Sequence, residues 1–201
     1  MASAPLLEEL KKRRTYYNIS NKSPISDERI KEIVQEIVLH VPSSFNSQTS
    51  RVVVLLKEDH EKLWDITAEV LKPIVPEAFW SRTATKLESF KIGYGTVLFF
   101  EDQVAVRKLQ DSFPLYQDNF PGWAEQTSGM IQLALWTAFQ MEGLGASLQH
   151  YNPLIDQKVK SEWNVPMAWN LIAQMPFGTP TAPPLDKDFI PIEQRVMVYG
   201  Q

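Results

Sequence analysis

The chain has 201 residues, a net charge of −4, 44% hydrophobic and 22% charged residues, and no cysteine. This length suits one domain with a sizeable core, and the acidic balance argues against a nucleic-acid partner bound through its phosphates. The lack of cysteine excludes thiol catalysis, thiolate metal sites and disulfides. The three histidines are too scattered in the sequence to indicate a metal site.

The N-terminal segment has acidic residues, Glu8 and Glu9, where a signal peptide needs an apolar run. No stretch reaches the roughly 20 apolar residues that a membrane span needs. We therefore expect a soluble cytoplasmic protein with no membrane partner.

A leucine pattern near the N-terminus predicts a short amphipathic helix that ends in a basic run, Lys11–Thr15. These cations complement the dipole at a helix C-terminus, which is the simpler interpretation. Alternatively, the forked donors of Arg13 and Arg14, together with the Thr15 hydroxyl, suit a phosphate. The segment by itself leaves both interpretations open.

Ser26 caps the next predicted helix, whose apolar stripe ends at Pro42. The following loop, 42–51, is dense in hydroxyls and amides and leads into a predicted strand, Val52–Leu56. Serine and asparagine favour turns, so the loop is a connector in the simpler interpretation. Its many neutral donors and acceptors, without a strong base, also suit a polar planar ligand.

Residues 58–91 predict two helices, separated by Pro73 and Pro76. The uninterrupted apolar run Thr96–Phe100 is typical of a strand that is covered on both faces, and Glu101-Asp102 closes it. The segment Phe113–Trp123 is rich in aromatic residues and prolines, so it cannot be a regular helix throughout. It is either a hydrophobic plug or the lid of a flat binding pocket.

A long and largely buried helix is predicted to start at Trp123 and to end before Gly143. A short strand, 146–149, follows, and at its mouth lie His150, Tyr151 and Asn152, where a ligand could bind. We further predict a helix over 154–163, a core strand over 169–175 that ends at Pro176, an extended tail over 179–190 and a final strand over 195–199. Such a tail often reaches a partner subunit.

Four features occur together in this order: Arg13-Arg14-Thr15, the loop P-S-S-F-N-S-Q, a long helix ending in G-L-G, and an extended C-terminal arm. Over essentially the whole chain they resemble the nitroreductase-like flavoproteins. The blocks Y-G-T-V-L-F-F-E-D (94–102) and L-Q-H-Y-N-P-L-I-D (148–156) are similar to a small fungal and bacterial branch, that of the fatty-acid-repression-mutant and copper-induced nitroreductases.

The resemblance implies an α+β fold, in which helices wrap a mixed sheet, and one domain spanning residues 1–201. It also implies an intertwined homodimer, with the arm 179–201 embracing the partner subunit. Two FMN molecules would lie at the dimer interface and would be reduced by NADH or NADPH.

The resemblance also implies FMN contacts on this sequence. The phosphate and ribityl chain would be bound by Arg13, Arg14 and Thr15. A loop from the second subunit would reach the flavin with Pro42, Ser43, Ser44, Asn46 and Gln48. Lys86 would lie near the pyrimidine edge, where a cation stabilises the anionic reduced flavin.

The remaining implied contacts come from the second half of the chain. The dimethylbenzene and N5 region would be covered by Gln149, His150, Tyr151 and Asn152, although the commoner Pro-x-Glu-Gly pattern is not present there. A further phosphate cation is expected in the arm, and both Lys187 and Arg195 are candidates. The substrate slot would be roofed by aromatic side chains, for which the candidates are Phe113, Tyr116, Phe120 and Trp123. Phe120 and Trp123 suit the core equally well.

The resemblance thus implies an FMN-dependent NAD(P)H oxidoreductase that reduces small nitroaromatic or quinone acceptors by a ping-pong scheme through flavin N5. Because the cofactor carries the chemistry, we expect no catalytic side chain and no metal. The sequence has neither a G-x-G-x-x-G fingerprint nor a G-x-S-x-G elbow. The alternatives are a flavin-binding redox sensor with incidental turnover and, less favoured, a nonenzymatic dimeric structural protein.

Overall fold

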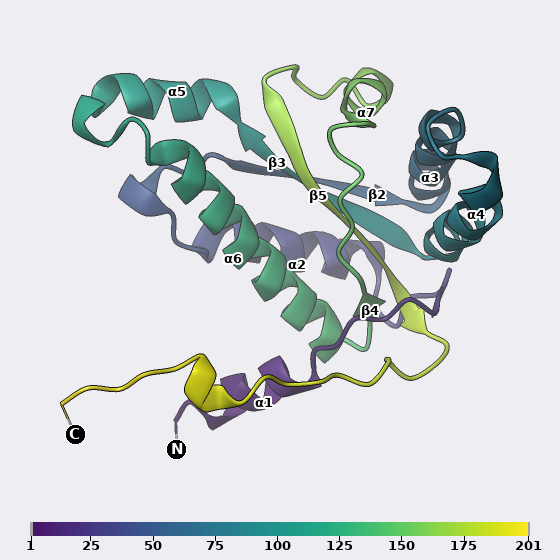
Figure 1. The fold of residues 1–201 in the computed structure, drawn as a ribbon, viewed down its shortest axis with the longest axis horizontal. Helices are drawn as coiled ribbons and strands as arrows, with labels where there is room; N and C mark the ends of the chain where they lie inside the picture. The colour runs from purple at the N-terminus through teal and green to yellow at the C-terminus, as the bar shows by residue number, and fades with distance from the viewer. Residues whose placement is uncertain (1, 201) are drawn as a thin grey trace.

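The computed structural model describes residues 2–200, and within this range seven α-helices surround a five-stranded sheet (Figure 1). The helices are α1 (Ala4–Lys12), α2 (Asp27–His40), α3 (Lys57–Leu71), α4 (Glu77–Lys91), α5 (Gln103–Ser112), α6 (Phe120–Met141) and α7 (Asp156–Glu162). The strands are β1 (Ile19–Ser20), β2 (Ser50–Leu56), β3 (Gly95–Asp102), β4 (Gly145–Ala146) and β5 (Trp169–Pro180). Three short 3-10 turns are η1 (Ser44–Asn46), η2 (Pro114–Tyr116) and η3 (Ile192–Gln194).

The sheet has the strand order β1-β5-β3-β2, and β4 pairs with β5 beside this path. All of these strand pairs are antiparallel. Among residues 2–200 the parallel element is an isolated bridge between Thr15 and Ala146. The α+β class is confirmed, and within one chain the expected mixed sheet is antiparallel apart from this bridge.

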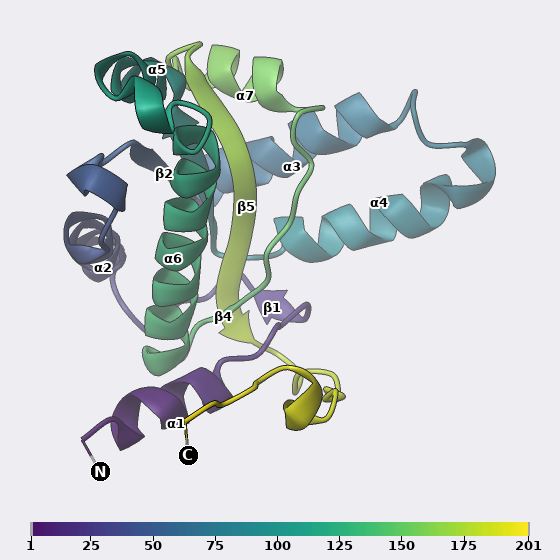
Figure 2. The same cartoon turned by 60° about the vertical axis from the view of Figure 1, so that its left-hand side comes forward.

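Strand β3 is covered on both faces, as its apolar run predicts. Val97 and Phe99 pack in the core cluster of α2 and α6, whereas Leu98 and Phe100 pack in a second cluster with α3, α4 and α7. Figure 2 shows α2 and α6 on one side of β5 and α3 and α4 on the other. The alternation follows from the two-residue period of a strand.

A β-bulge in β5 places Leu171 and Ala173 on opposite faces of the strand. Phe99 pairs with Ala173 and Phe100 with Leu171, so Ile172 is the extra residue between them. The bulge reverses the side-chain alternation, and as a result Ala173 packs in the α2/α6 cluster while Leu171 packs in the other.

Helix α6 crosses the sheet and carries nine buried residues. It begins at Phe120, three residues before the predicted start at Trp123, because Pro121 fits the first turn, where its missing N–H costs nothing. It ends as predicted at Gly143, whose φ of 82° is left-handed. The Gly143 and Leu144 N–H groups bond the Gln140 and Phe139 carbonyls at 3.1 and 2.8 Å, which is a Schellman motif.

Two elements, α5 and β5, differ from the sequence predictions. Helix α5 was not predicted, although Asp102 caps it. Strand β5 continues to Pro180 instead of ending at Pro176, because the Pro176 carbonyl still accepts a bond from Ser147 N at 3.2 Å. At Gly178 a Cβ would lie 2.1 Å from the Ser20 carbonyl oxygen, so β1 can pair closely only with glycine there.

Two predicted strands near the chain end are also different. The strand expected over 146–149 is limited to Gly145–Ala146 and a single bridge from Gln149 to Gln174. The strand expected over 195–199 is wrong for the single chain, where these residues follow η3 without strand pairing. In Figure 1 the tail passes beside α1, away from the edges of the sheet, and so it has no strand to pair with.

Candidate functional site

A cavity of about 330 Å³ lies between the end of α1 and the C-terminal tail. It is lined by Arg13, Arg14, Thr15, Tyr17, Leu185, Asp186 and Lys187. The tertiary structure thus brings together the predicted basic motif and one of the two candidate cations of the arm. We call this cavity the basic pocket. Its three cations and the hydroxyl groups of Thr15 and Tyr17 suit an anion, and Asp186 partly offsets the positive charge.

Both arginines of the basic pocket contact other parts of the chain, which fix their positions. The Arg13 guanidinium lies over the Trp136 ring of α6, with Cζ 4.5 Å from the ring centroid. The Arg14 Nη2 donates a hydrogen bond to the Leu185 carbonyl, which ties the tail to the end of α1. The contact of Trp136 with Arg13 was not predicted, because the position of a tryptophan on an apolar helix does not indicate which cation it will contact.

Arg13 also shows features of a site that binds an anion. Its Nε is buried and has no hydrogen-bond partner in the described structure. Burial lowers the pKa of Arg13 from its ordinary value, and the adjacent charge of Arg14 lowers this pKa further. A bound anion would accept the unused donor and offset both effects.

The polar loop between α2 and β2 has a strained backbone. Phe45, Asn46 and Gln48 have φ values of 57°, 51° and 50°, in the left-handed region that costs non-glycine residues about 1–3 kcal/mol each. Ser43 Oγ accepts a bond from Gln48 N at 3.0 Å, and Arg51 Nη1 donates to the Gln48 carbonyl at 2.7 Å. Such strain persists only where surrounding contacts hold it, and it is concentrated at functional sites.

The strained loop presents Phe45 to the predicted roof. The Phe45 ring centroid lies 4.9 to 5.8 Å from the centroids of Phe113, Tyr116, Phe120 and Trp123. Phe45 is 51% exposed, and Phe113 and Tyr116 are also exposed. We call this cluster of five rings the aromatic roof: Phe45, Phe113, Tyr116, Phe120 and Trp123. Phe45 was not predicted as a site residue, because the one signal in the sequence was a large apolar residue inside a polar loop.

One roof candidate is a core residue. Phe120 is 2% exposed and packs with Val106 and Ala124 under the other rings. It lies at the first position of α6, which turns its ring inward toward α5. Trp123 is partly buried against the same cluster and stacks on Phe45 with an interplanar angle of 22°.

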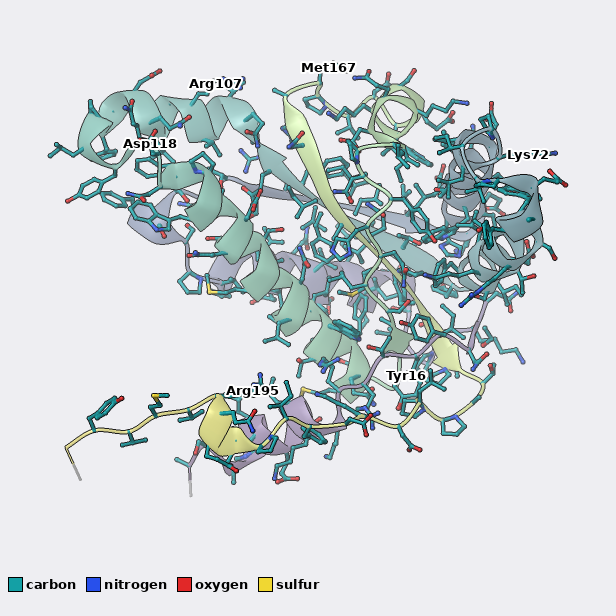
Figure 3. All side chains as sticks on the ribbon, in the orientation of Figure 1. Tyr16, Lys72, Arg107, Asp118, Met167 and Arg195 are labelled. Carbon is teal, nitrogen blue, oxygen red and sulfur yellow. The ribbon has the colours of Figure 1, made fainter. Side chains whose placement is uncertain are left out.

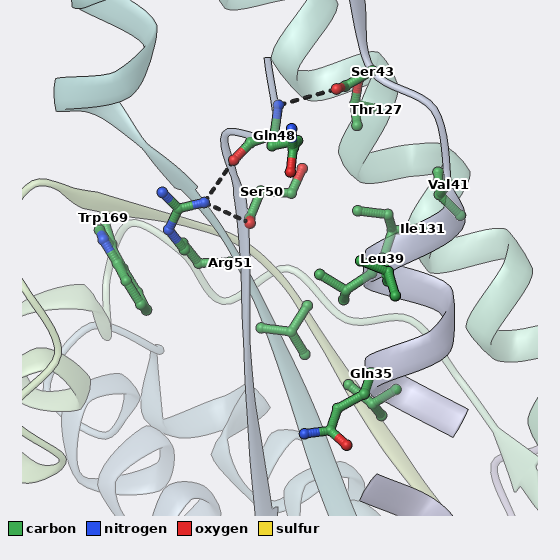
Figure 4. Close-up of a pocket in the computed structure, with 13 residues that line it drawn as sticks. Gln35, Leu39, Val41, Ser43, Gln48, Ser50, Arg51, Thr127, Ile131 and Trp169 are labelled. Carbon is green, nitrogen blue, oxygen red and sulfur yellow. Dashed lines mark hydrogen bonds between the residues drawn. The ribbon is translucent and has the colours of Figure 1, made fainter. Parts of the chain in front are cut away.

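A second cavity, of about 520 Å³, opens between α2, the start of β2 and α6 (Figure 4). Ser43 and Gln48 of the predicted loop lie at one end, and Gln35 lies at the other. Apolar side chains of α2 and α6 form the wall, among them Leu39 and Ile131. Arg51 also lines the cavity, and its charge is paired with Asp102 at 3.0 Å. An apolar wall with a polar rim suits a flat ligand better than a highly charged one.

The segment 149–152 is largely anchored in the core. Gln149 exchanges two backbone bonds with Gln174, at 2.7 and 2.9 Å. The Gln174 amide accepts from Tyr151 N at 2.7 Å and donates to Asn152 Oδ1 at 3.2 Å. Burial raises the pKa of Tyr151 to about 12. Of the four predicted residues, only His150 is exposed.

Other predicted residues are not brought together in one chain. Lys86 is exposed on α4, with Nζ 5.7 Å from the Phe90 ring, and Arg195 lies on the tail beside α1 (Figure 3). Neither lines the basic pocket. Within residues 2–200, no group of three or more His, Asp or Glu side chains is placed to hold a metal, and no helix is both long and apolar enough to cross a bilayer.

Comparisons with known proteins identify the family of this chain. Residues 10–179 match the model of the Nitroreductase family. The chain is 40% identical to the Saccharomyces cerevisiae protein HBN1, over 94% of this chain and 95% of HBN1, and 36% identical to nitroreductase FRM2 of the same yeast, over 92% of each. The chain belongs to the nitroreductase family. Family and fold together support an oxidoreductase function.

Solved structures extend the comparison. The nitroreductase CinD from Lactococcus lactis, in complex with nicotinic acid, is 44% identical and has a TM-score of 0.90, with 97% of this chain and 100% of CinD covered. CinD has also been solved with chloramphenicol and with 4-nitrophenol. A nitroreductase-fold protein from Desulfovibrio desulfuricans, solved with FMN, has a TM-score of 0.69 but only 18% identity over 98% of each chain, so it shows the fold alone.

Along α6 the two halves of this nitroreductase-family site are far apart. Arg13 contacts Trp136 and Phe45 contacts Trp123, so the contacts are 13 residues, or about 20 Å, apart on the helix. Figure 1 shows α1 beside the C-terminal end of α6, and Arg13 and Arg14, which follow α1, line the basic pocket. The polar loop, by contrast, contacts the start of α6 through Phe45. The predicted phosphate-binding residues and the predicted flavin-edge loop are therefore far apart within one chain.

Proposed function

We propose that this chain is an FMN-dependent oxidoreductase that takes electrons from NADH or NADPH and passes them to small nitroaromatic or quinone acceptors. The observation that carries the proposal is the basic pocket, in which Arg13, Arg14 and Lys187 meet from opposite ends of the chain. Two guanidinium groups, an ammonium and the Thr15 hydroxyl form a donor set that fits a mononucleotide phosphate. The unused Nε of Arg13 supports the same ligand.

FMN, when bound, supplies the acceptance and donation of hydride, so the protein itself has to bind, orient and shield. Arg13, Arg14 and Lys187 balance the charge of the phosphate. The hydroxyls and amides of the loop 42–48 offer neutral hydrogen bonds to the edge of a flavin ring. None of these groups needs to change its protonation state, which agrees with a site that has no dedicated acid or base.

The exposed rings of the aromatic roof suit an aromatic acceptor. These rings belong to Phe45, Phe113 and Tyr116 and have polarisable flat faces. They lie where the strained loop contacts the turn between α5 and α6. CinD, a relative at 43% identity, has been solved with 4-nitrophenol and with chloramphenicol. Those ligands belong to CinD, and they support the class of nitroaromatic acceptors for this chain.

A homodimer is part of the proposal. The basic pocket and the polar loop lie at opposite ends of α6, so one flavin that contacts both must receive the loop from a second copy. The exposed apolar side chains along the tail also favour a partner: Leu185, Phe189, Ile190, Ile192, Val196, Met197, Val198 and Tyr199. The tail, 179–201, would embrace that partner and cover them.

The decisive experiment combines one spectrum with one assay. We expect the purified protein, after addition of FMN and removal of unbound flavin by gel filtration, to show oxidised-flavin absorption bands and to oxidise NADH or NADPH faster when a benzoquinone or a nitrobenzene is added. Bands without acceleration by any acceptor would favour a flavin-binding sensor. A colourless protein after FMN addition would contradict the proposal and favour a structural dimer.

A further inference from the structure

The acidic pair at the end of β3, Glu101 and Asp102, is bonded to Thr49 and to the first two residues of β2, Ser50 and Arg51. Glu101 is 1% exposed, and its carboxylate accepts hydrogen bonds from Thr49 Oγ1 at 2.6 Å and from Ser50 Oγ. The Asp102 N–H also donates to the Thr49 carbonyl at 3.0 Å. Burial raises the pKa of Glu101, while the two hydroxyls and the charge of Arg51 lower it.

Asp102 extends these bonds to a second segment. One carboxylate oxygen, Oδ2, lies 3.0 Å from Arg51 Nη2, and the Arg51 Nη1 donates to the carbonyls of Gln48 and Ser50 at 2.7 and 3.0 Å. The other oxygen, Oδ1, accepts from Val104 N at 3.0 Å and from the next residue's N–H at 3.3 Å, which caps α5. Asp102 is thus linked through Arg51 to Gln48 of the loop 42–48, and it directly caps the helix that leads to Phe113.

The two segments held by this pair meet again at the aromatic roof. Phe45 of the loop contacts Phe113 and Tyr116, which follow α5. The loop has three left-handed residues, so it needs contacts that outweigh its strain. A buried carboxylate is a costly way to fasten a sheet, because an apolar pair would do so without desolvating a charge. The burial of the Glu101 carboxylate is explained if its bonds to Thr49 and Ser50 fix the conformation of the loop 42–48.

We infer that Glu101 and Asp102 are positioning residues, which fix the loop 42–48 and the aromatic roof in one arrangement and so determine where the acceptor lies. The inference rests on the proposed function, because the loop matters for the reaction only if it faces the flavin. Neither side chain lines the basic pocket or the cavity beside α2. They act through Thr49, Ser50 and Arg51.

The inference can be tested first without cofactor, by hydrogen–deuterium exchange of the apoprotein. Glu101→Ala should speed amide exchange about tenfold in both 42–48 and 113–119, because the loop loses the bonds that hold it. Glu101→Gln, which is nearly isosteric and keeps one acceptor, should retain most of the protection and remain folded. Asp102→Asn, which keeps the cap on α5, should affect 42–48 more than 113–119.

Thr96→Val is the matched control, because Thr96 is a buried and hydrogen-bonded residue of the same strand that faces His60 and Trp64 instead of the loop. It should lower the melting temperature and leave exchange in 42–48 unchanged. The inference is overturned if Thr96→Val speeds exchange in the loop as much as Glu101→Ala does, or if neither Glu101 variant changes it.

Assays on the FMN-loaded enzyme separate this inference from the proposed function. Glu101→Ala should raise the KM for a nitrobenzene acceptor several-fold, about fivefold or more, and Glu101→Gln should restore most of it. Arg14→Ala should weaken FMN binding and leave loop exchange in the apoprotein unchanged. If the parent protein binds no flavin, the proposed function fails. If flavin binds but Glu101→Ala leaves both loop exchange and acceptor KM unchanged, the positioning role alone fails.

Discussion

At the scale of single residues, the hydrogen bonds of the buried His60 determine which of its ring nitrogens carries the proton. His60 is fully buried on α3, with Nδ1 2.8 Å from Thr96 Oγ1 and Nε2 3.1 Å from the Lys91 carbonyl. Because a carbonyl only accepts, Nε2 carries the proton and Nδ1 accepts from the Thr96 hydroxyl. The same hydroxyl accepts from Trp64 Nε1 at 3.1 Å. Burial lowers the pKa of His60 to about 4.

This pKa predicts that the protein loses stability in mild acid. The ordinary pKa of His60 is 6.5, so between pH 6.5 and about 4 the unfolded chain binds a proton that the folded chain does not. The contribution to the free energy of unfolding is complete above pH 6.5 and is lost as the pH falls to about 4, by about 3 kcal/mol in all. Urea unfolding at a series of pH values measures this loss.

The matched variant is His60→Gln, which keeps an amide donor but cannot gain a proton. Its stability should be lower at pH 7 and should depend less steeply on pH between 6.5 and 4. Burial raises the pKa of Glu101 and Asp156, and these carboxyl groups act in the opposite direction, favouring the folded state as the pH falls. The difference between parent and variant therefore isolates His60, and equal slopes would contradict the prediction.

Arg14 carries a second prediction at this scale. A charge-assisted phosphate bond contributes about 1.5–3 kcal/mol, whereas removing a charge from a helix end costs under about 0.5 kcal/mol of stability. Arg14→Ala should therefore fold normally and bind FMN about tenfold or more weakly, as measured by flavin titration. Lys12→Ala is the control, because Lys12 pairs with Glu9 at 2.8 Å and does not line the basic pocket. Equal FMN affinity in both variants would contradict the role of Arg14.

At the scale of elements, the aromatic roof forms where three segments of the chain meet. The loop after α2 contributes Phe45, the turn after α5 contributes Phe113 and Tyr116, and the start of α6 contributes Phe120 and Trp123. The last two face the core more than the solvent, so they support the roof from below. The rings accessible to a ligand come from the two connecting segments.

Tyr116 is the residue that best tests the roof. Tyr116→Ala should leave FMN binding and the melting temperature nearly unchanged, because Tyr116 is exposed and packs on only part of the cluster. It should raise the KM for aromatic acceptors, since a stacking contact is worth about 0.5–1.5 kcal/mol. Steady-state kinetics with quinones and nitrobenzenes measure the change.

Leu115→Ala is the control for this prediction, because Leu115 is in the same turn, is 91% exposed and has no part in the ring contacts. It should leave acceptor kinetics unchanged. If Tyr116→Ala instead unfolds the protein, or releases the flavin without changing acceptor preference, the turn is scaffold and the substrate lies elsewhere.

At the scale of the whole molecule, α6 separates the basic pocket at one of its ends from the polar loop 42–48 at the other. The proposed cofactor would contact both. The tail runs past α1 and exposes Val196, Met197, Val198 and Tyr199, and its backbone is without strand pairing in the single chain. An extended segment with exposed apolar side chains gains stability when a second copy covers it. We therefore expect the last residues of the tail to contribute to the stability of the proposed dimer.

Deleting residues 195–201 should weaken the dimer and leave the basic pocket complete, since Lys187 stays in the chain. We expect the parent protein to sediment as a dimer at micromolar concentration and the truncated chain to shift toward monomer. Loss of flavin should follow on dilution, as the loop of the second copy departs. Unchanged sedimentation of the truncated chain at nanomolar concentration would show that the dimer does not depend on these residues.

The sequence by itself determined the local features of this protein. The alternation and runs of apolar residues located the strand at 96–100 and its two covered faces, and Gly143 marked the end of α6. These features depend on neighbours within a few positions, so periodicity and backbone preference are sufficient to find them. The ordered motifs led to the nitroreductase family for the same reason, since they are local patterns.

Only the tertiary structure decided which distant groups meet. Arg14 and Leu185 are 171 residues apart, and Glu101 meets Ser50 across 51 residues. A one-residue bulge in β5 determines which cluster receives Leu171. Phe45 becomes the centre of the aromatic roof because left-handed backbone angles turn it toward α5 and α6. Such contacts follow from register and from the path of the chain, to which no short stretch of sequence is sensitive.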